Sequence, residues 1–133
     1  MLMSWEKNLV LNVPEMDSEH IKLIEHANNL FKAMQNGHDH DLVVKHLKFL
    51  EDYTREHFSH EEAFQIKIAY PDSENHKKIH DAFKKIVSNL IKEIQIHGLN
   101  EKKCIEINKM TMTWIRQHIA KEDKKVATYY KNL

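Results

Sequence analysis

The sequence contains few residues that interrupt helices and almost no cysteine. Of its 133 residues, two are glycine, two are proline and one is cysteine. Because glycine and proline are the strongest breakers of regular structure, their scarcity favours long, uninterrupted helices. The single cysteine, Cys104, excludes a disulfide within the chain and is typical of a protein from a reducing compartment.

The sequence also lacks a membrane segment, a secretion signal and an excess of one charge. No window reaches the apolar length of a transmembrane helix, and the first residues, MLMSWEKNLVLNVPEMD, do not follow the design of a signal peptide. Lysine plus arginine and aspartate plus glutamate number 20 each, so no general attraction to nucleic acid or to an anionic membrane is expected. These absences predict a cytoplasmic protein that binds neither.

Helix signals divide the chain into four segments and a leading arm. Asp17 and Ser18 offer side chains for an N-cap, and Pro71 cannot continue a helix. Gly37 and Gly98 suit the position that follows a helix C-terminus. We expect helices at about 18–36, 41–69, 74–97 and 101–131, after a mostly extended arm at 1–16. Four helices with short connections predict an all-α, up-down-up-down four-helix bundle in a single domain over residues 1–133.

The sequence contains 11 histidines, and helical periodicity places five of them in the core. Successive residues of an α-helix step by about 100° around its axis, so residues that share an apolar stripe are identified from their spacing. The five that fall on such stripes, at least one in each predicted helix, are His20, His57, His76, His80 and His118.

The segment REHFSHEEAF, at 55–64, adds a carboxylate to this set. Relative to His57, Glu61 falls within about 40°, His60 at roughly 60° and Glu62 at about 140°. Glu61 is therefore expected inside, His60 at the boundary and Glu62 in water. An unpartnered buried polar group costs about 1–3 kcal/mol, and an isolated charge costs more. A bound cation removes this cost, because neutral imidazoles and carboxylates are natural metal ligands.

The conjunction of these groups is more specific than any one spacing. A pair such as His76 and His80 is expected about once by chance in so histidine-rich a chain. The alternative interpretation is a set of separately hydrogen-bonded core histidines. Lys77 stands where a zinc protease motif would place its glutamate, and the chain has no Glu-x-x-His tetrad of the ferritin type. His38 and His40, in the turn NGHDHD, are expected in a solvated loop rather than in a second metal site.

Five stretches of the chain match one known pattern. They are the N-terminal arm with Trp5, MDSEHIKLI, HFSHEE, HKKIH and WIRQHIAKED. Through them the chain resembles the hemerythrin family, and most closely its single-domain bacterial members, over nearly its whole length. The family's string of ligand residues, H…HxxxE…HxxxH…HxxxxD, is filled completely.

The resemblance implies two iron ions at the centre of the bundle. One would be held by His76, His80 and His118, and the other by His20 and His57, with one position left open. Glu61 and Asp123 would bridge the two ions together with a solvent-derived oxo or hydroxo group. Dioxygen would bind at the open iron in an apolar pocket whose walls are implied to be Leu23, Phe58, Phe83, Trp114 and Ile115.

One implied ligand conflicts with regular helical geometry. Asp123 follows His118 by five residues, about 140° around an α-helix, whereas Glu122 is only about 40° away. Periodicity alone favours Glu122. The resemblance favours Asp123, which requires a locally wide turn of the kind that π-bulges provide at functional sites.

The resemblance implies a non-enzymatic dioxygen-binding protein that acts as a carrier, a store or a delivery agent. One alternative is a sensor of O₂, NO or redox state that acts through a separate protein partner. Another is a di-iron oxidase or a peroxide-scavenging enzyme. Since charged residues cover the outer helix faces, we expect a monomer.

Overall fold

The computed structural model describes residues 2–35 and 39–133, and every element within them is helical. The four long helices are α1 (Pro14–Gln35), α2 (His40–Lys67), α3 (Ser73–His97) and α4 (Glu101–Gln117). A π-helical turn, η2 (His118–Asp123), and α5 (Lys124–Lys131) continue α4, and a 3₁₀ turn, η1 (Lys7–Leu9), lies in the arm. The predicted all-α four-helix bundle is confirmed.

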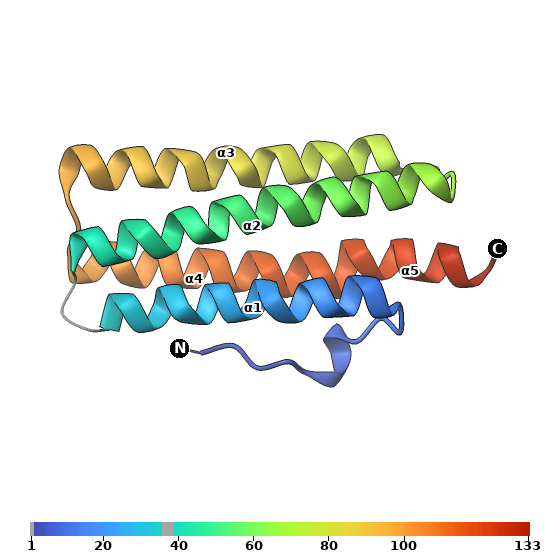
Figure 1. The fold of residues 1–133 in the computed structure, drawn as a ribbon, viewed down its shortest axis with the longest axis horizontal. Coiled ribbons are helices and arrows are strands. Elements are labelled where there is room, and N and C mark those ends of the chain that lie inside the picture. The colour runs from blue at the N-terminus through green and yellow to red at the C-terminus, as the bar shows by residue number, and fades with distance from the viewer. Residues whose placement is uncertain (1, 36–38) are drawn as a thin grey trace.

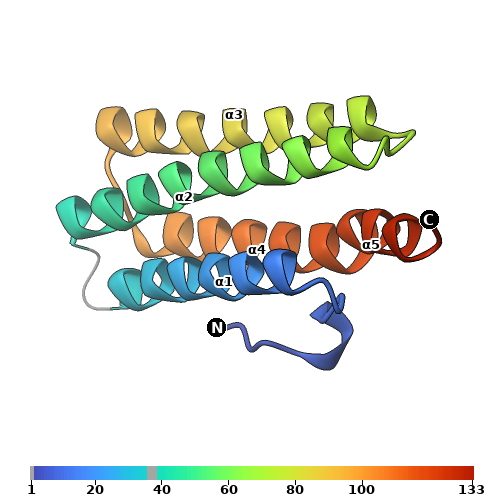
Figure 2. The ribbon, with the colours of Figure 1, turned by 45° about the vertical axis from the view of Figure 1, so that its right-hand side comes forward.

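The helices run up and down in two layers. Figure 1 and Figure 2 show α2 and α3 side by side, above α1 and the rod formed by α4, η2 and α5. Helix α1 contacts both α2 and α4, and α2 contacts α3. The N-terminal arm lies alongside α1 (Figure 1). The side chain of Asn28, on α1, exchanges two hydrogen bonds of 2.8 Å with the backbone of Met3 in the arm.

The first helix begins earlier than the sequence pattern predicted. It starts at Pro14 rather than at about 18, because proline suits the first helical position, where no N–H is needed. Asp17 does not cap this helix; its carboxylate accepts hydrogen bonds from the backbone N–H groups of Leu11 (2.9 Å) and Asn12 (3.1 Å). The extended arm therefore ends at residue 13, not 16.

The other helix ends lie close to the predicted positions. Helix α2 begins at His40 after its N-cap, Asp39, whose side chain accepts from the N–H of Leu42 (3.1 Å). His40 was expected in a solvated loop; its ring nitrogen Nε2 instead lies 3.1 Å from the carbonyl oxygen of Ile94. Gly98 ends α3 with φ +79°, which suits glycine. The predicted helix end at Gly37 and the turn residue His38 lie outside the described residues.

The core is apolar over most of its length and polar near one end. Leu30, Leu47 and Ile107 are typical of the apolar part, each at most 1% exposed. Near the connection between α2 and α3 the core instead contains histidines and carboxylates. No helix within 2–35 and 39–133 combines the length and the apolar character that a membrane crossing requires.

Candidate metal centre

Four helical rods each contribute to one buried polar cluster, which we call the centre. His57 and Glu61 lie one turn apart on α2, as do His76 and His80 on α3, and this i, i+4 spacing directs each pair to one side of its helix. His20 comes from α1 and the remaining two residues from η2. All seven side chains are at most 5% exposed: His20, His57, Glu61, His76, His80, His118 and Asp123.

The first carboxylate, Glu61, lies between histidines from three helices. Its Oε2 atom is 3.0 Å from Nε2 of His20 and 3.3 Å from Nε2 of His57. Its Oε1 atom is 3.3 Å from Nε2 of His80. The two oxygens therefore face different histidines.

The second carboxylate, Asp123, repeats this division. Its Oδ2 atom is 3.1 Å from Nε2 of His20. Its Oδ1 atom is 3.1 Å from Nε2 of His76 and 3.2 Å from Nε2 of His118. Each carboxylate thus turns one oxygen toward the α1–α2 side, to His20 and, for Glu61, also His57. The other oxygen faces the histidines of α3 and η2: His80 for Glu61, and His76 and His118 for Asp123.

The wide turn η2 brings Asp123 into the cluster. A π-helical turn bonds residues five apart, so His118 and Asp123 point to the same side of the rod. Asp123 is fully buried, whereas the side chain of Glu122 is 21% exposed and lies 3.5 Å from Lys125. The inward position that periodicity favoured for Glu122 is therefore wrong, because the helix is not regular here.

Several atoms of the cluster have no hydrogen-bond partner among the described residues. They are Oε1 of Glu61, Nε2 of His76, both carboxylate oxygens of Asp123 and the Nδ1 atoms of His20 and His118. These atoms lie close to one another but do not have the geometry of hydrogen bonds. Burial of polar atoms without hydrogen bonds costs free energy. Two sets of donor atoms, each within 4.8 Å of one another, suit metal ions: Glu61, His76, His80, His118 and Asp123 in one, and His20, His57, Glu61 and Asp123 in the other. The residues present fit a metal pair that shares the two carboxylates.

Comparison with known proteins agrees with this arrangement. Residues 11–130 match the family model described as "Hemerythrin HHE cation binding domain". The chain belongs to the hemerythrin family. Its relatives include a bacteriohemerythrin of Clostridium acetobutylicum, 33% identical over 90% of this chain and 95% of that protein. A bacteriohemerythrin of Campylobacter jejuni is 31% identical over 94% of this chain and 92% of its own length.

The solved structures that resemble this hemerythrin share its whole fold. The crystal structure of a wild-type hemerythrin superposes with a TM-score of 0.84 at 27% identity, over 96% of this chain and 97% of the other. A second solved structure, of a mutant in which phenylalanine replaces a leucine, superposes equally well, with a TM-score of 0.84. The likeness therefore extends over the complete bundle.

Aromatic side chains cover one side of the hemerythrin centre. The ring of Phe58 stacks on that of His80, with centroids 3.7 Å apart and planes at 1°. Trp114 stacks on His118 at 4.4 Å and on Phe83 at 3.8 Å. The five residues implied as pocket walls all lie in one hydrophobic cluster; four are buried and Trp114 is half-buried: Leu23, Phe58, Phe83, Trp114 and Ile115. This packing removes water from around the imidazoles.

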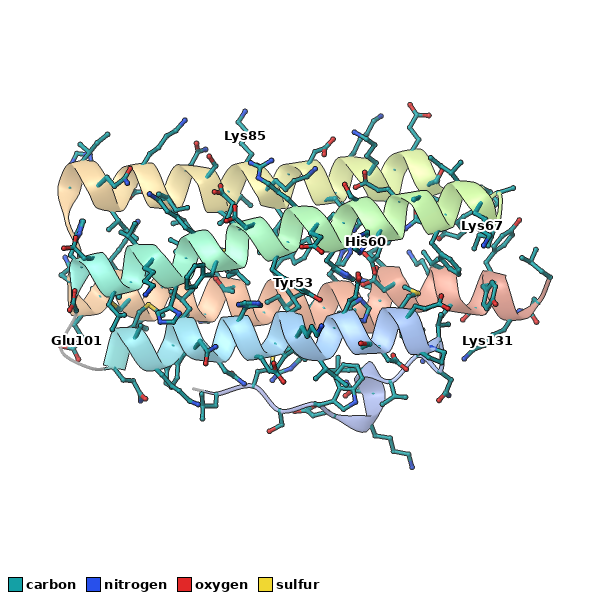
Figure 3. The ribbon with its side chains drawn as sticks, viewed as in Figure 1. Tyr53, His60, Lys67, Lys85, Glu101 and Lys131 are labelled. Atoms are coloured by element: carbon teal, nitrogen blue, oxygen red, sulfur yellow. The ribbon has the colours of Figure 1, made fainter. Side chains whose placement is uncertain are left out.

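Two further carboxylates orient the imidazoles from outside. The carboxylate of Glu19 accepts a hydrogen bond from Nδ1–H of His57 (2.7 Å), and that of Glu62 accepts one from Nδ1–H of His80 (2.9 Å). Tyr53, labelled in Figure 3, donates to the backbone carbonyl of Glu19 (3.1 Å) and so ties α1 to α2 at this point. Because Nδ1 is bound by these carboxylates, Nε2 of each histidine is the atom that faces the centre and would bind a metal.

The role of Glu19 did not follow from the spacing of residues, and the position expected for Glu62 was wrong. Glu62 was expected in water, yet its side chain is only 18% exposed because it reaches across to α3. A chemical argument could have found both residues. A histidine that binds a metal needs a hydrogen-bond acceptor for its second nitrogen, and Glu19 and Glu62 directly adjoin His20 and Glu61 in the sequence.

The imidazoles and carboxylates of the metal-free centre stabilise each other's charges. Burial alone would lower the pKa of His20, but Asp123 and Glu61 raise it to about 9. Burial acts the same way on His57, yet Glu61 and Glu19 raise its pKa to about 10. Burial would raise the pKa of Glu61, as does the charge of Asp123, but His57 and His20 hold it well below 4.5. A metal ion that binds here replaces the imidazole protons.

Proposed function

We propose that this hemerythrin binds dioxygen reversibly at a pair of iron ions, as a carrier, store or delivery protein rather than as an enzyme. The observation that carries this proposal is the division of the two carboxylates. Glu61 directs one oxygen toward His20 and His57 and the other toward His80. Asp123 directs one oxygen toward His20 and the other toward His76 and His118. This arrangement supports two metal positions with unequal numbers of protein ligands.

The residues divide between the two positions as follows. The fuller position has the imidazoles of His76, His80 and His118, and the other has those of His20 and His57. An iron pair at these positions would supply two electrons and one open site for dioxygen. The unequal division would leave that open site at the ion held by His20 and His57.

The side chains around the centre favour binding over further chemistry. Five imidazoles and two carboxylates give the metals little negative charge, which disfavours highly oxidised iron. The rings of Phe58, Phe83 and Trp114 pack beside His80 and His118 and keep water away from these imidazoles. Both properties support reversible binding.

A visible spectrum tests the proposal. Metal-free protein is loaded with Fe²⁺ under inert gas, its iron content is measured, and it is then exposed to air. We expect two iron ions per chain and a charge-transfer band that appears in air and disappears under inert gas. Protein loaded with Zn²⁺ is the control, since zinc has no redox chemistry. Fewer than two iron ions, or a band that forms only once while oxygen is steadily consumed, would contradict the proposal.

A further inference from the structure

A pocket of about 250 Å³ lies beside the centre, between α1 and α2. From α1 it is lined by Glu15, Met16 and Glu19, and from α2 by His60, Glu61 and Phe64. Figure 3 labels His60 on α2. The side chain of His60 is 54% exposed and that of Glu61 is 2% exposed. The pocket therefore connects the solvent to a residue of the centre.

The lining of this pocket is suited to a cation. It contains three carboxylates and one imidazole, and the described lining residues include neither lysine nor arginine. Carboxylates with no basic residue among them attract divalent metal ions from solution.

A second observation points to the same ligand. Glu61 is buried, and its Oε1 atom accepts no hydrogen bond from the described residues. Its carboxylate belongs to both sets of donor atoms in the centre. Glu61 thus lines the inner end of the pocket, with Oε2 on the side of His20 and His57 and the unpartnered Oε1 on the side of His80. A cation that enters through the pocket would reach this carboxylate first.

His60 is oriented as metal-binding histidines are. Its Nδ1–H donates to Oε2 of Glu19 at 2.6 Å, while Oε1 of the same carboxylate accepts from His57 at 2.7 Å. Histidines that bind metals usually donate their second nitrogen to a carboxylate in this way. Nε2 of His60 is therefore the nitrogen that is left for a ligand, on a side chain that is half-exposed to solvent and next to the carboxylate of Glu19.

We propose that Glu15, Glu19 and His60 form a loading site, at which a hydrated divalent metal ion such as Fe²⁺ binds transiently before it passes to Glu61. This inference rests on the proposed function, since it assumes a metal pair at the centre. The seven residues of the centre are at most 5% exposed, so an ion needs a polar route inward. Dioxygen is neutral and gains nothing from such a lining, so the route serves the metal.

Metal uptake by metal-free protein tests the loading site. Co²⁺ is the probe, because its visible absorption changes when imidazoles replace its water ligands, and stopped-flow mixing gives the rate. We expect the double variant Glu15→Gln, His60→Gln to take up Co²⁺ about tenfold more slowly than the wild type, because electrostatic steering changes association rates by at least this factor. The final content should remain two ions per chain. The single variant Glu15→Gln should also load slowly.

The matched control is the double variant Glu25→Gln, His46→Gln. It changes one acid on α1 and one histidine on α2, as the test variant does, but away from the pocket. We expect the control to load like the wild type. Added NaCl should slow the wild type more than the test variant, since it screens the carboxylates.

The outcomes separate the two proposals. If the test variant loads two ions as fast as the wild type, the loading site is wrong and the proposed function stands. If the variant binds fewer than two ions, Glu15 and His60 belong to the centre itself, which also contradicts a transient site. If the wild type does not bind two ions, the proposed function fails, and the loading site with it.

Discussion

At the scale of single residues, the charges of the centre decide its response to pH. In the metal-free protein, His20 and His57 have pKa values raised to about 9 and about 10, because the neighbouring carboxylates outweigh their burial. His118, and after it His20 and His76, hold the pKa of Asp123 well below 3.8 against the effect of burial. The metal-free protein therefore contains buried imidazolium–carboxylate pairs over a wide range of pH.

The stability of the metal-free protein should fall at both ends of this range. A histidine whose pKa is raised on folding stabilises the fold fully below 6.5, and this contribution is lost as the pH rises through 9 to 10. Carboxylates with lowered pKa values stabilise it above about 4.5 and lose this effect on acidification. Thermal unfolding at a series of pH values should give the highest Tm between about pH 4.5 and 6.5, where both contributions are present.

Protein loaded with Zn²⁺ provides the comparison. Metal binding requires deprotonated imidazoles. The Tm of the loaded protein should therefore stay constant between pH 6.5 and 9, while the Tm of the metal-free protein falls over the same interval. A Tm of metal-free protein that rises over this interval would show that the histidines are buried in their neutral form.

The two outer carboxylates should affect metal affinity without binding metal. Glu19→Ala and Glu62→Ala each remove the acceptor of a ligand histidine's Nδ1–H. We expect each to weaken metal binding by about 10- to 100-fold, the usual effect of such partners. Competition with a chromophoric chelator measures the affinity. Glu56→Ala, an exposed acid on the same helix as Glu62, is the control and should bind like the wild type.

At the scale of elements, the π-helical turn η2 selects the second carboxylate. Its wider turn rotates Asp123 inward and leaves Glu122 at the boundary beside Lys125. After η2, α5 continues with Val126 and Ala127 buried, so the irregular turn is accommodated without loss of the apolar face.

This element predicts opposite effects for two neighbouring substitutions. Asp123→Asn should lose at least one of the two metal ions, because it removes a carboxylate that both sets of donors share. Glu122→Gln should keep both. Metal content after gel filtration measures the difference. Loss of metal from the Glu122 variant, with retention in the Asp123 variant, would mean that the rod is a regular α-helix in the loaded protein.

At the scale of the whole molecule, the centre joins all four rods of the bundle near one end. The apolar core runs through the remaining length, as the buried Leu30, Leu47 and Ile107 indicate. Metal ions at the centre would cross-link elements that are far apart in the sequence, and a ligand that binds only the folded state adds to its stability.

Metal removal should therefore lower the Tm of the protein. When free metal exceeds its dissociation constant about a thousandfold, the stabilisation is about 4 kcal/mol. Unfolding followed by circular dichroism, with and without a chelator, measures the change. The Asp123→Asn variant should respond less to the chelator. Equal Tm values of the loaded and metal-free wild type would contradict a role of the metal in joining the helices.

The sequence by itself determined which residues face the core. The inward positions of His20, His57 and Glu61 followed from their spacing, because the angular position of a residue on a regular helix depends only on its own segment. The bundle followed for the same reason, since four amphipathic segments with short connections have few other ways to bury their apolar faces.

Only the tertiary structure decided how these residues meet. The division of the oxygens of Glu61 and Asp123 between two sets of histidines depends on the relative rotation of the helices. The contacts of Glu19 and Glu62 cross from one helix to another, so no single segment contains them. The wide turn at η2 was implied by the resemblance, and the structure confirms it. Periodicity, which assumes a regular helix, does not indicate it.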